Sequence, residues 1–105
     1  MIYNELGWNS EVLISGFTIY RFGKLRIMSL TGVSINASGT VYQLATKDCP
    51  PGTVVAPVME TIAGGKAYPA LTNITYTGDF KIYYYNPTGV SGTGVGYGSV
   101  VYYAG

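Results

Sequence analysis

Short runs in which apolar and polar residues alternate dominate this chain, and such runs are typical of β-strands. The segment 17–22 (FTIYRF) alternates, and the segment 25–35 (LRIMSLTGVSI) follows it after Gly23 and Lys24. These two segments predict a β-hairpin closed by a tight turn at Gly23. Convincing helical periodicity is absent, and Val, Ile, Thr, Tyr and Gly outnumber the good helix formers.

The second arm of this hairpin changes the phase of its alternation. Leu25 and Ile27 share one face of the predicted strand, whereas Met28 and Leu30 share the other. Two structures explain this pattern: a β-bulge near residues 27–29, or a strand that is covered on both faces.

The middle of the chain predicts two more strands with a stiff loop between them. A turn signal at 36–39 (NASG) precedes a short strand at 40–46 (TVYQLAT), and two prolines stiffen the loop 47–53 (KDCPPGT). The next strand is 54–62 (VVAPVMETI). Because Pro57 cannot donate a hydrogen bond to a neighbouring strand, it indicates a sheet edge or a bulge.

The last third of the chain predicts a second hairpin and a final strand. The segment 71–77 (LTNITYT) alternates, and Gly78-Asp79 fit the two central positions of a type II′ turn. The return strand 80–85 has two faces, one with Phe80, Ile82 and Tyr84 and the other with Lys81, Tyr83 and Tyr85. We predict the last strand at 99–103 (SVVYY), because the preceding tract is too rich in glycine for a strand.

These elements predict an all-β fold. About seven short strands joined by turns are typical of a compact Greek-key or jelly-roll-like β-barrel or sandwich. No internal repeat is visible, so we expect one domain over residues 1–105, in which residues 1–10 are a candidate neck or linker remnant.

Charge is scarce, which changes the expected surface. The 105 residues include six Lys or Arg and five Asp or Glu, and 10% of residues are charged, where roughly 25% is usual. Neutral polar residues or another subunit must therefore cover much of the surface, and a chain of this size often needs a partner for stability. The basic residues are scattered, so we expect no nucleic-acid binding.

The sequence gives little support for a catalytic site or a metal site. The chain has one cysteine, Cys49, and no histidine, which excludes an intrachain disulfide and a multi-thiolate metal site and leaves the thiol without a histidine base. The five acids, Glu5, Glu11, Asp48, Glu60 and Asp79, fall in different loops or termini, and we interpret them as solvated loop acids. We therefore expect no enzyme, no catalytic residue, no metal and no cofactor.

Membrane insertion and secretion signals are also missing from the sequence. No stretch approaches the roughly 18 apolar residues that a membrane-spanning helix needs. The start, MIYNELGW, lacks a basic region followed by an apolar run. We expect no membrane insertion and no removable leader, unless the sequence is an excised fragment.

The aromatic residues are the best candidates for function. Eleven tyrosines accompany one tryptophan, and an aromatic ring with a polar tip suits a half-buried sheet face or a wet contact surface. Tyr83 and Tyr85 are assigned to a subunit interface, an exposed strand face or a sugar-binding cleft. Trp8 is assigned to a cap on the core or to a contact surface. Candidate saccharide contacts are Trp8, Gln43, Asp48, Tyr83, Tyr85, Asn86 and Tyr97, with rings for stacking and the others for hydroxyl groups.

The order of these features resembles the C-terminal head or tip domain of phage tail-fibre and baseplate receptor-binding proteins, the lactococcal type especially. The resemblance uses an early Trp8, the hairpin segment 21–25 (RFGKL), the proline loop 47–58 (KDCPPGTVVAPV), the hairpin 74–82 (ITYTGDFKI) and the final VVYYA. The proline loop has Val55-Ala56-Pro57 where that family has an arginine before its last proline.

The resemblance implies a homotrimer with clefts between protomers that bind saccharides of the bacterial cell envelope. It also implies other tail or baseplate proteins as partners, and a virion location, outside the cell when the protein functions. The expected function is host adhesion without catalysis. A purely structural trimerisation or docking domain is the alternative.

Overall fold

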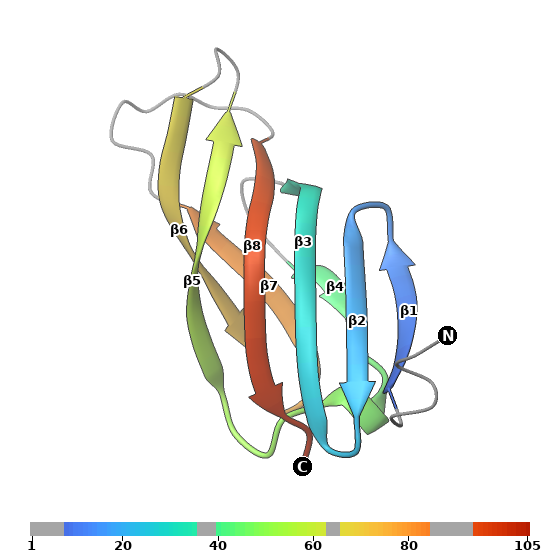
Figure 1. Ribbon diagram of the computed structural model, residues 1–105. Coiled ribbons are helices and arrows are strands. Elements are labelled where there is room, and N and C mark those ends of the chain that lie inside the picture. The colour runs from blue at the N-terminus through green and yellow to red at the C-terminus, as the bar shows by residue number, and fades with distance from the viewer. Residues whose placement is uncertain (1–7, 36–39, 63–65, 85–93) are drawn as a thin grey trace.

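The computed structural model describes residues 8–35, 40–62, 66–84 and 94–105, which form one sheet of eight antiparallel strands (Figure 1). The strands are β1 (Trp8–Ile14), β2 (Phe17–Phe22), β3 (Leu25–Ile35), β4 (Thr40–Gln43), β5 (Val54–Ile62), β6 (Lys66–Ile74), β7 (Asp79–Tyr84) and β8 (Gly94–Tyr103). A short 3-10 turn, η1 (Thr46–Asp48), follows β4. The all-β prediction is confirmed, with one strand more than expected.

The strand order makes the sheet a Greek key. The order is β1-β2-β3-β8-β5-β6-β7-β4. Within it, β5, β6 and β7 form a meander, and β8 returns to lie beside β5, which is the arrangement that defines a Greek key. The strands β1 and β4 at the two ends of the order are not paired with each other.

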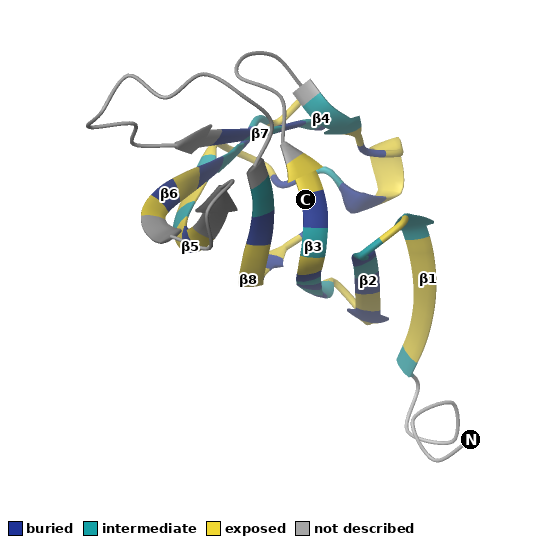
Figure 2. Ribbon diagram, turned by 90° about the horizontal axis from the view of Figure 1, so that it is seen from above, coloured by how far each residue is buried: buried dark blue, intermediate teal, exposed yellow. Residues whose placement is uncertain are grey.

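The sheet curls, so that β7 and β4 lie across the core from β2 and β3 (Figure 2). Ring contacts join the two sides: the centroid of the Phe17 ring lies 4.8 Å from that of Phe80 and 5.8 Å from that of Tyr42. The result is a barrel left open between β1 and β4. Its core consists of Phe17, Ile19, Met28, Leu30, Val33, Leu44, Val58, Ala70, Ile74, Phe80, Ile82, Val100 and Tyr102.

The first hairpin forms as predicted. Phe22 pairs with Leu25, and Gly23, with a φ of 56°, opens the two-residue turn between β2 and β3. No register shift occurs at residues 27–29, and both Leu25 and Ile27 are half-buried while Met28 is fully buried. The strand is therefore covered to some extent on both faces, and its irregularity lies further on, between Thr31 and Val33.

The second hairpin turns differently from the prediction. β6 ends at Ile74, which pairs with Phe80, and the N–H of Gly78 donates to the carbonyl of Thr75. The central residues of the turn are thus Tyr76 and Thr77, and the predicted two-residue turn at Gly78-Asp79 is wrong. Gly78 takes the following left-handed position, with a φ of 95°, and glycine is the residue that closes such three-residue loops without strain.

Residues 94–98 of the glycine-rich tract are part of the last strand, so the loop predicted for them is wrong, and residues 85–93 lie outside the described residues. β8 begins at Gly94, and residues 94–98 (GVGYG) pair with β3 and in part with β5. Close packing explains the glycine at position 98, because a β-carbon there would lie 3.1 Å from Cγ1 of Val58, and its φ is 148°. Glycine in this strand provides clearance for the neighbouring strand.

Residues 8–10 belong to β1, although the sequence interpretation placed them in a candidate neck or linker. The sequence of β1 (WNSEVLI) does not alternate regularly between polar and apolar residues. It therefore gives no clear strand signal, although the segment pairs with β2 in the structure. Residues 1–7 lie outside the described residues.

Candidate functional site

The outward face of the sheet carries almost all the exposed large apolar side chains of the described residues. Strand register places them there, because directly paired residues share a face. The set is Val12, Tyr20, Phe22, Val55, Met59, Leu71, Tyr97, Val101 and Tyr103, and the one other exposed member, Tyr76, lies in the turn after β6.

Two rows of side chains on this face make up what we call the apolar band: the first crosses β1, β2, β3 and β8, and the second crosses β2, β3 and β8. In the first row Phe22 pairs with Trp8 and with Leu25, which pairs with Tyr103; in the second, Tyr20 pairs with Ile27, which pairs with Val101. The rings of Trp8 and Phe22 stack with their centroids 5.1 Å apart. The band consists of Trp8, Tyr20, Phe22, Leu25, Ile27, Val101 and Tyr103, none of which is charged.

A row of hydroxyl side chains bounds the apolar band. Thr18 pairs with Ser29, and Ser29 pairs with Ser99, on the same outward face. Beyond this row the outward face becomes apolar again at Tyr97 of β8, which pairs with Met59 of β5. On β2, β3 and β8 the outward face therefore has two apolar regions separated by hydroxyl groups, while on β1 the partner of Thr18 is the exposed Val12.

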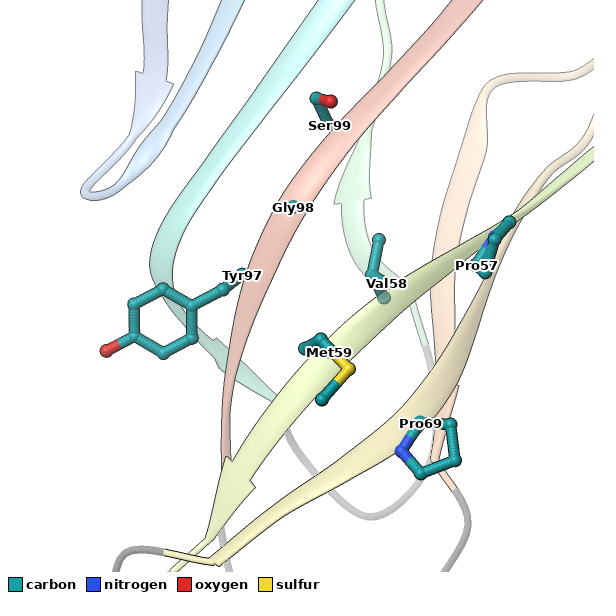
Figure 3. A pocket seen from close by; sticks show the side chains of 7 residues that line it. All are labelled: Pro57, Val58, Met59, Pro69, Tyr97, Gly98 and Ser99. Atoms are coloured by element: carbon teal, nitrogen blue, oxygen red, sulfur yellow. The ribbon is translucent and has the colours of Figure 1, made fainter.

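The second apolar region contains an open hollow of about 360 Å³, lined by Pro57, Val58, Met59, Pro69, Tyr97, Gly98 and Ser99 (Figure 3). It forms because β5 and β8 pair only from Met59 to Thr61 and separate beyond Met59. Pro57 lies past that point, on a stretch of β5 that pairs with β6 alone. Of the edge or bulge that Pro57 predicted, the structure shows a local edge on the β8 side of an interior strand, with no bulge, and this edge is one wall of the β5–β8 hollow.

Tyr97 forms an aromatic platform beside the β5–β8 hollow. Its side chain extends from β8 toward β3, away from Pro57 and Pro69 (Figure 3), and its hydroxyl lies 3.5 Å from where a β-carbon of Gly32 would be. Gly32 lies at the irregular point of β3, where its φ of 76° favours glycine, and the Tyr97 ring reaches across the strand there. With 42% of the residue exposed, the ring can stack on a ligand, and the neighbouring Ser99 offers a hydroxyl group.

A second polar cluster, centred on Asp48, lies buried at the other end of the barrel. Arg21 donates from Nε to Oδ1 and from Nη2 to Oδ2 of Asp48, both at 2.8 Å, and Nε of Arg26 donates to the same Oδ1 at 2.7 Å. Arg21 also reaches Glu11 at 2.8 Å and Asn9 at 3.3 Å. The interpretation of Asp48 as a solvated loop acid is wrong, because its carboxylate is 1% exposed.

The Asp48 cluster fastens the loop after β4 to the sheet. Nη2 of Arg26 donates to the carbonyl of Lys47 at 3.0 Å, and the hydroxyl of Tyr102 donates to the carbonyl of Asp48 at 2.6 Å. The N–H of Gly105 donates to the carbonyl of Cys49 at 2.9 Å. These bonds satisfy buried polar groups, and the cluster has a structural role.

The electrostatics of the cluster follow from its burial and its pairing. Burial alone would raise the pKa of Asp48, but hydrogen bonds from Arg21 and Arg26 outweigh it and hold this pKa below its ordinary value. Burial raises the pKa of the Tyr102 hydroxyl well above its usual range. Burial also raises the pKa of Cys49, which keeps the thiol protonated at neutral pH.

The structure does not gather the predicted saccharide contacts into one site. Tyr97 lies at the β5–β8 hollow, whereas Trp8 lies in the apolar band, displaced by six residues along the strands, about 20 Å, and by three strands across the sheet, about 14 Å. Gln43 donates from Nε2 to the carbonyl of Thr77 at 2.8 Å and supports the turn after β6. Asp48 is buried between two arginines, so that its carboxylate is not free for a ligand.

The remaining candidates are only partly described. Tyr83 lies in β7 with Leu71 as its register partner, while Tyr85 and Asn86 lie outside the described residues. Sequence reasoning missed Met59, Pro69 and Ser99 as neighbours of Tyr97. Pro57 was the one sequence signal for this hollow. It indicated an edge or a bulge in its strand, but not which strand lies opposite.

Among the described residues, no group of three or more His, Cys, Asp or Glu side chains is arranged to hold a metal ion. The same residues include no helix long and apolar enough to cross a membrane. No protein-family model matches the chain, and no curated protein is significantly similar to it in sequence.

Proposed function

We propose that this chain is a non-catalytic adhesion module of a virion that binds a saccharide of the bacterial cell envelope. The observation that carries the proposal is the exposed Tyr97 ring beside the open β5–β8 hollow. A pyranose ring presents an apolar face to an aromatic side chain, and its hydroxyl groups need polar neighbours. Tyr97 and Ser99 provide these two kinds of contact at one place.

The walls of the hollow support a binding role over a catalytic one. Pro57, Met59 and Pro69 offer shape and apolar surface but no group that can transfer a proton. Two of the described acids are already bound by arginine side chains and are not free for catalysis. Asp48 is held by arginines, and Glu11 is held by Arg21. Glycoside cleavage would need two carboxyl groups at one site.

The proposal includes several copies of the site on each particle. A hollow with few polar groups binds a sugar weakly, and a homotrimer with many copies on a tail would convert weak sites into strong attachment. Other tail or baseplate proteins would hold the trimer in place.

A second candidate is a structural docking domain of a tail fibre that binds no glycan. The apolar lining of the hollow favours it, because a neighbouring protein could fill the same space with apolar side chains. The two candidates differ in whether the isolated protein binds carbohydrate.

The test is an array of cell-wall polysaccharides and intact cells from Gram-positive bacteria, probed with the labelled protein. Binding to at least one polysaccharide, with no reducing sugar released, is the expected result. Failure to bind any cell or polysaccharide, or failure to compete with a virus that carries the protein, would favour the docking domain. Release of reducing sugar would contradict both candidates.

A further inference from the structure

The apolar band exposes large apolar side chains that a sheet face in contact with water does not need. Tyr103 and Val101 are 68% and 59% exposed, and Phe22 and Tyr20 are 43% and 36% exposed. All four project from one face of the sheet, from β2 and β8 on the two sides of β3. Antiparallel sheets that face water usually carry polar side chains on that face, so this face is built for contact with something apolar.

The size of the apolar band suits a protein interface. Since aromatic side chains bury ~150–250 Å² each, the band exposes on the order of 500 Å² of apolar surface, the upper range for a monomer and over half of the ~800 Å² that each partner gives to a standard interface. The band lies on the outer side of the curled sheet, and an outward sheet face can pack against another sheet face.

Charge decides which partner fits the apolar band. None of its seven residues is charged, and the arginines next to them in sequence, Arg21 and Arg26, are buried on the other face of the sheet. An uncharged face packs against another copy of the chain without like-charge repulsion, and in a ring of three copies it packs against a different face of its neighbour. Symmetric association of identical chains is the commonest kind of assembly in soluble proteins.

We propose that the apolar band on β1, β2, β3 and β8 is the surface through which copies of this chain associate. Trp8 and Phe22 stack at one edge of the contact, and Tyr103 and Val101 of β8 lie at the other. The hydroxyl row of Thr18, Ser29 and Ser99 forms the rim, where polar groups border the buried centre.

This inference deepens the proposed function, because it names the partner and the surface behind the multiple sites, yet it stands on a different observation. The β5–β8 hollow lies beyond the hydroxyl row, so association through the band leaves Tyr97 exposed. The hollow then sits beside the seam between two copies. That position agrees with the saccharide clefts between protomers that the family resemblance implies.

The experiment is the mass in solution by light scattering, with two matched valine variants. Val101→Lys places a charge in the apolar band, while Val55→Lys places the same charge on the outward face of β5, outside the band. The two valines are 59% and 57% exposed, and neither belongs to the buried core. Circular dichroism confirms that each variant folds, and Tyr103→Lys replaces Val101→Lys if that variant does not fold.

We expect the unmodified chain and Val55→Lys to show the same multiple of the 11.2 kDa chain mass, three times for a trimer, and Val101→Lys to show the mass of one chain. An unmodified chain at 11.2 kDa overturns the inference, and the band then belongs to another partner or to the chain's own residues 1–7. Equal assembly of both variants also overturns it. Glycan binding is read separately, so that a monomer that still binds polysaccharide would contradict this inference and leave the proposed function standing.

Discussion

Arg21 holds Asp48 through both carboxylate oxygens, with two hydrogen bonds of 2.8 Å between residues that are 27 positions apart. This two-point contact joins the C-terminal end of β2 to the 3-10 turn that follows β4. Arg26 binds the same carboxylate from β3. The loop that leads into β5 is thus fixed by a buried charge cluster at one end of an otherwise apolar barrel.

Replacing Asp48 with asparagine should lower the free energy of unfolding by about 3–5 kcal/mol, because removal of one partner leaves buried charges unpaired. Glu11→Gln is the control, since Glu11 binds the same Arg21 from a side chain that is 52% exposed. Exposed ion pairs contribute about 0–1 kcal/mol. Urea unfolding of both variants measures the difference, and equal losses would contradict the structural role assigned to Asp48.

Acid should remove the contribution of Asp48. Its pKa in the folded protein is below the ordinary value of 3.8, so the unfolded chain binds the proton more readily. The stabilisation is therefore complete above the ordinary pKa and is lost as the pH falls through the folded-state pKa. Unfolding free energies measured at falling pH should converge for the unmodified protein and Asp48→Asn. A gap that stays constant below the ordinary pKa would show that ionisation of Asp48 is not responsible.

Gly98→Ala should destabilise the fold by about 1–3 kcal/mol, since the position combines a strained backbone conformation with a close neighbour. Its φ is 148°, and the added carbon would lie 3.1 Å from Cγ1 of Val58. Gly52→Ala is the control, because no atom lies within 4 Å of its added carbon and its φ is not positive. Thermal unfolding compares the two, and an unaffected Gly98→Ala protein would refute the close packing of β8 on β5.

Trp8 provides a direct optical signal for association, because it is the one tryptophan of the chain and stacks on Phe22 in the apolar band. Dilution should shift its fluorescence to longer wavelength as the copies separate and water reaches the ring. Val101→Lys should show the shifted spectrum at every concentration. A spectrum that is independent of concentration and equal in the two proteins would place Trp8 away from any contact between copies.

The fold could be predicted where local pattern decides it. The β2–β3 hairpin follows from alternation and from Gly23, and Phe80 and Ile82 are buried on the face that alternation assigns to them. β1 could not be predicted, because polar and apolar residues do not alternate clearly in its sequence. Its strand conformation depends on pairing with β2. The strand character of Gly94 to Gly98 depends on pairing with β3, and tertiary pairing outweighs the low strand propensity of glycine.

The candidate site was less accessible from sequence than the fold. Tyr97 was identified as a candidate ring, but its neighbours Met59 and Ser99 depend on how β8 meets β5 across the Greek key. The burial of Asp48 depends on Arg21, which lies on the inward face with Phe17 and Ile19. Alternation places Arg21 on that face, but only the curl of the sheet brings the loop with Asp48 over it.

The most direct test of the proposed adhesion function is polysaccharide binding by Tyr97→Ala compared with Tyr76→Ala. Both tyrosines are exposed, but Tyr76 lies in the turn after β6, outside the hollow and the apolar band. Loss of binding in Tyr97→Ala alone, with the assembled mass unchanged in both variants, is the predicted result. Equal binding by the two variants, or equal loss in both, would contradict a saccharide site at the β5–β8 hollow.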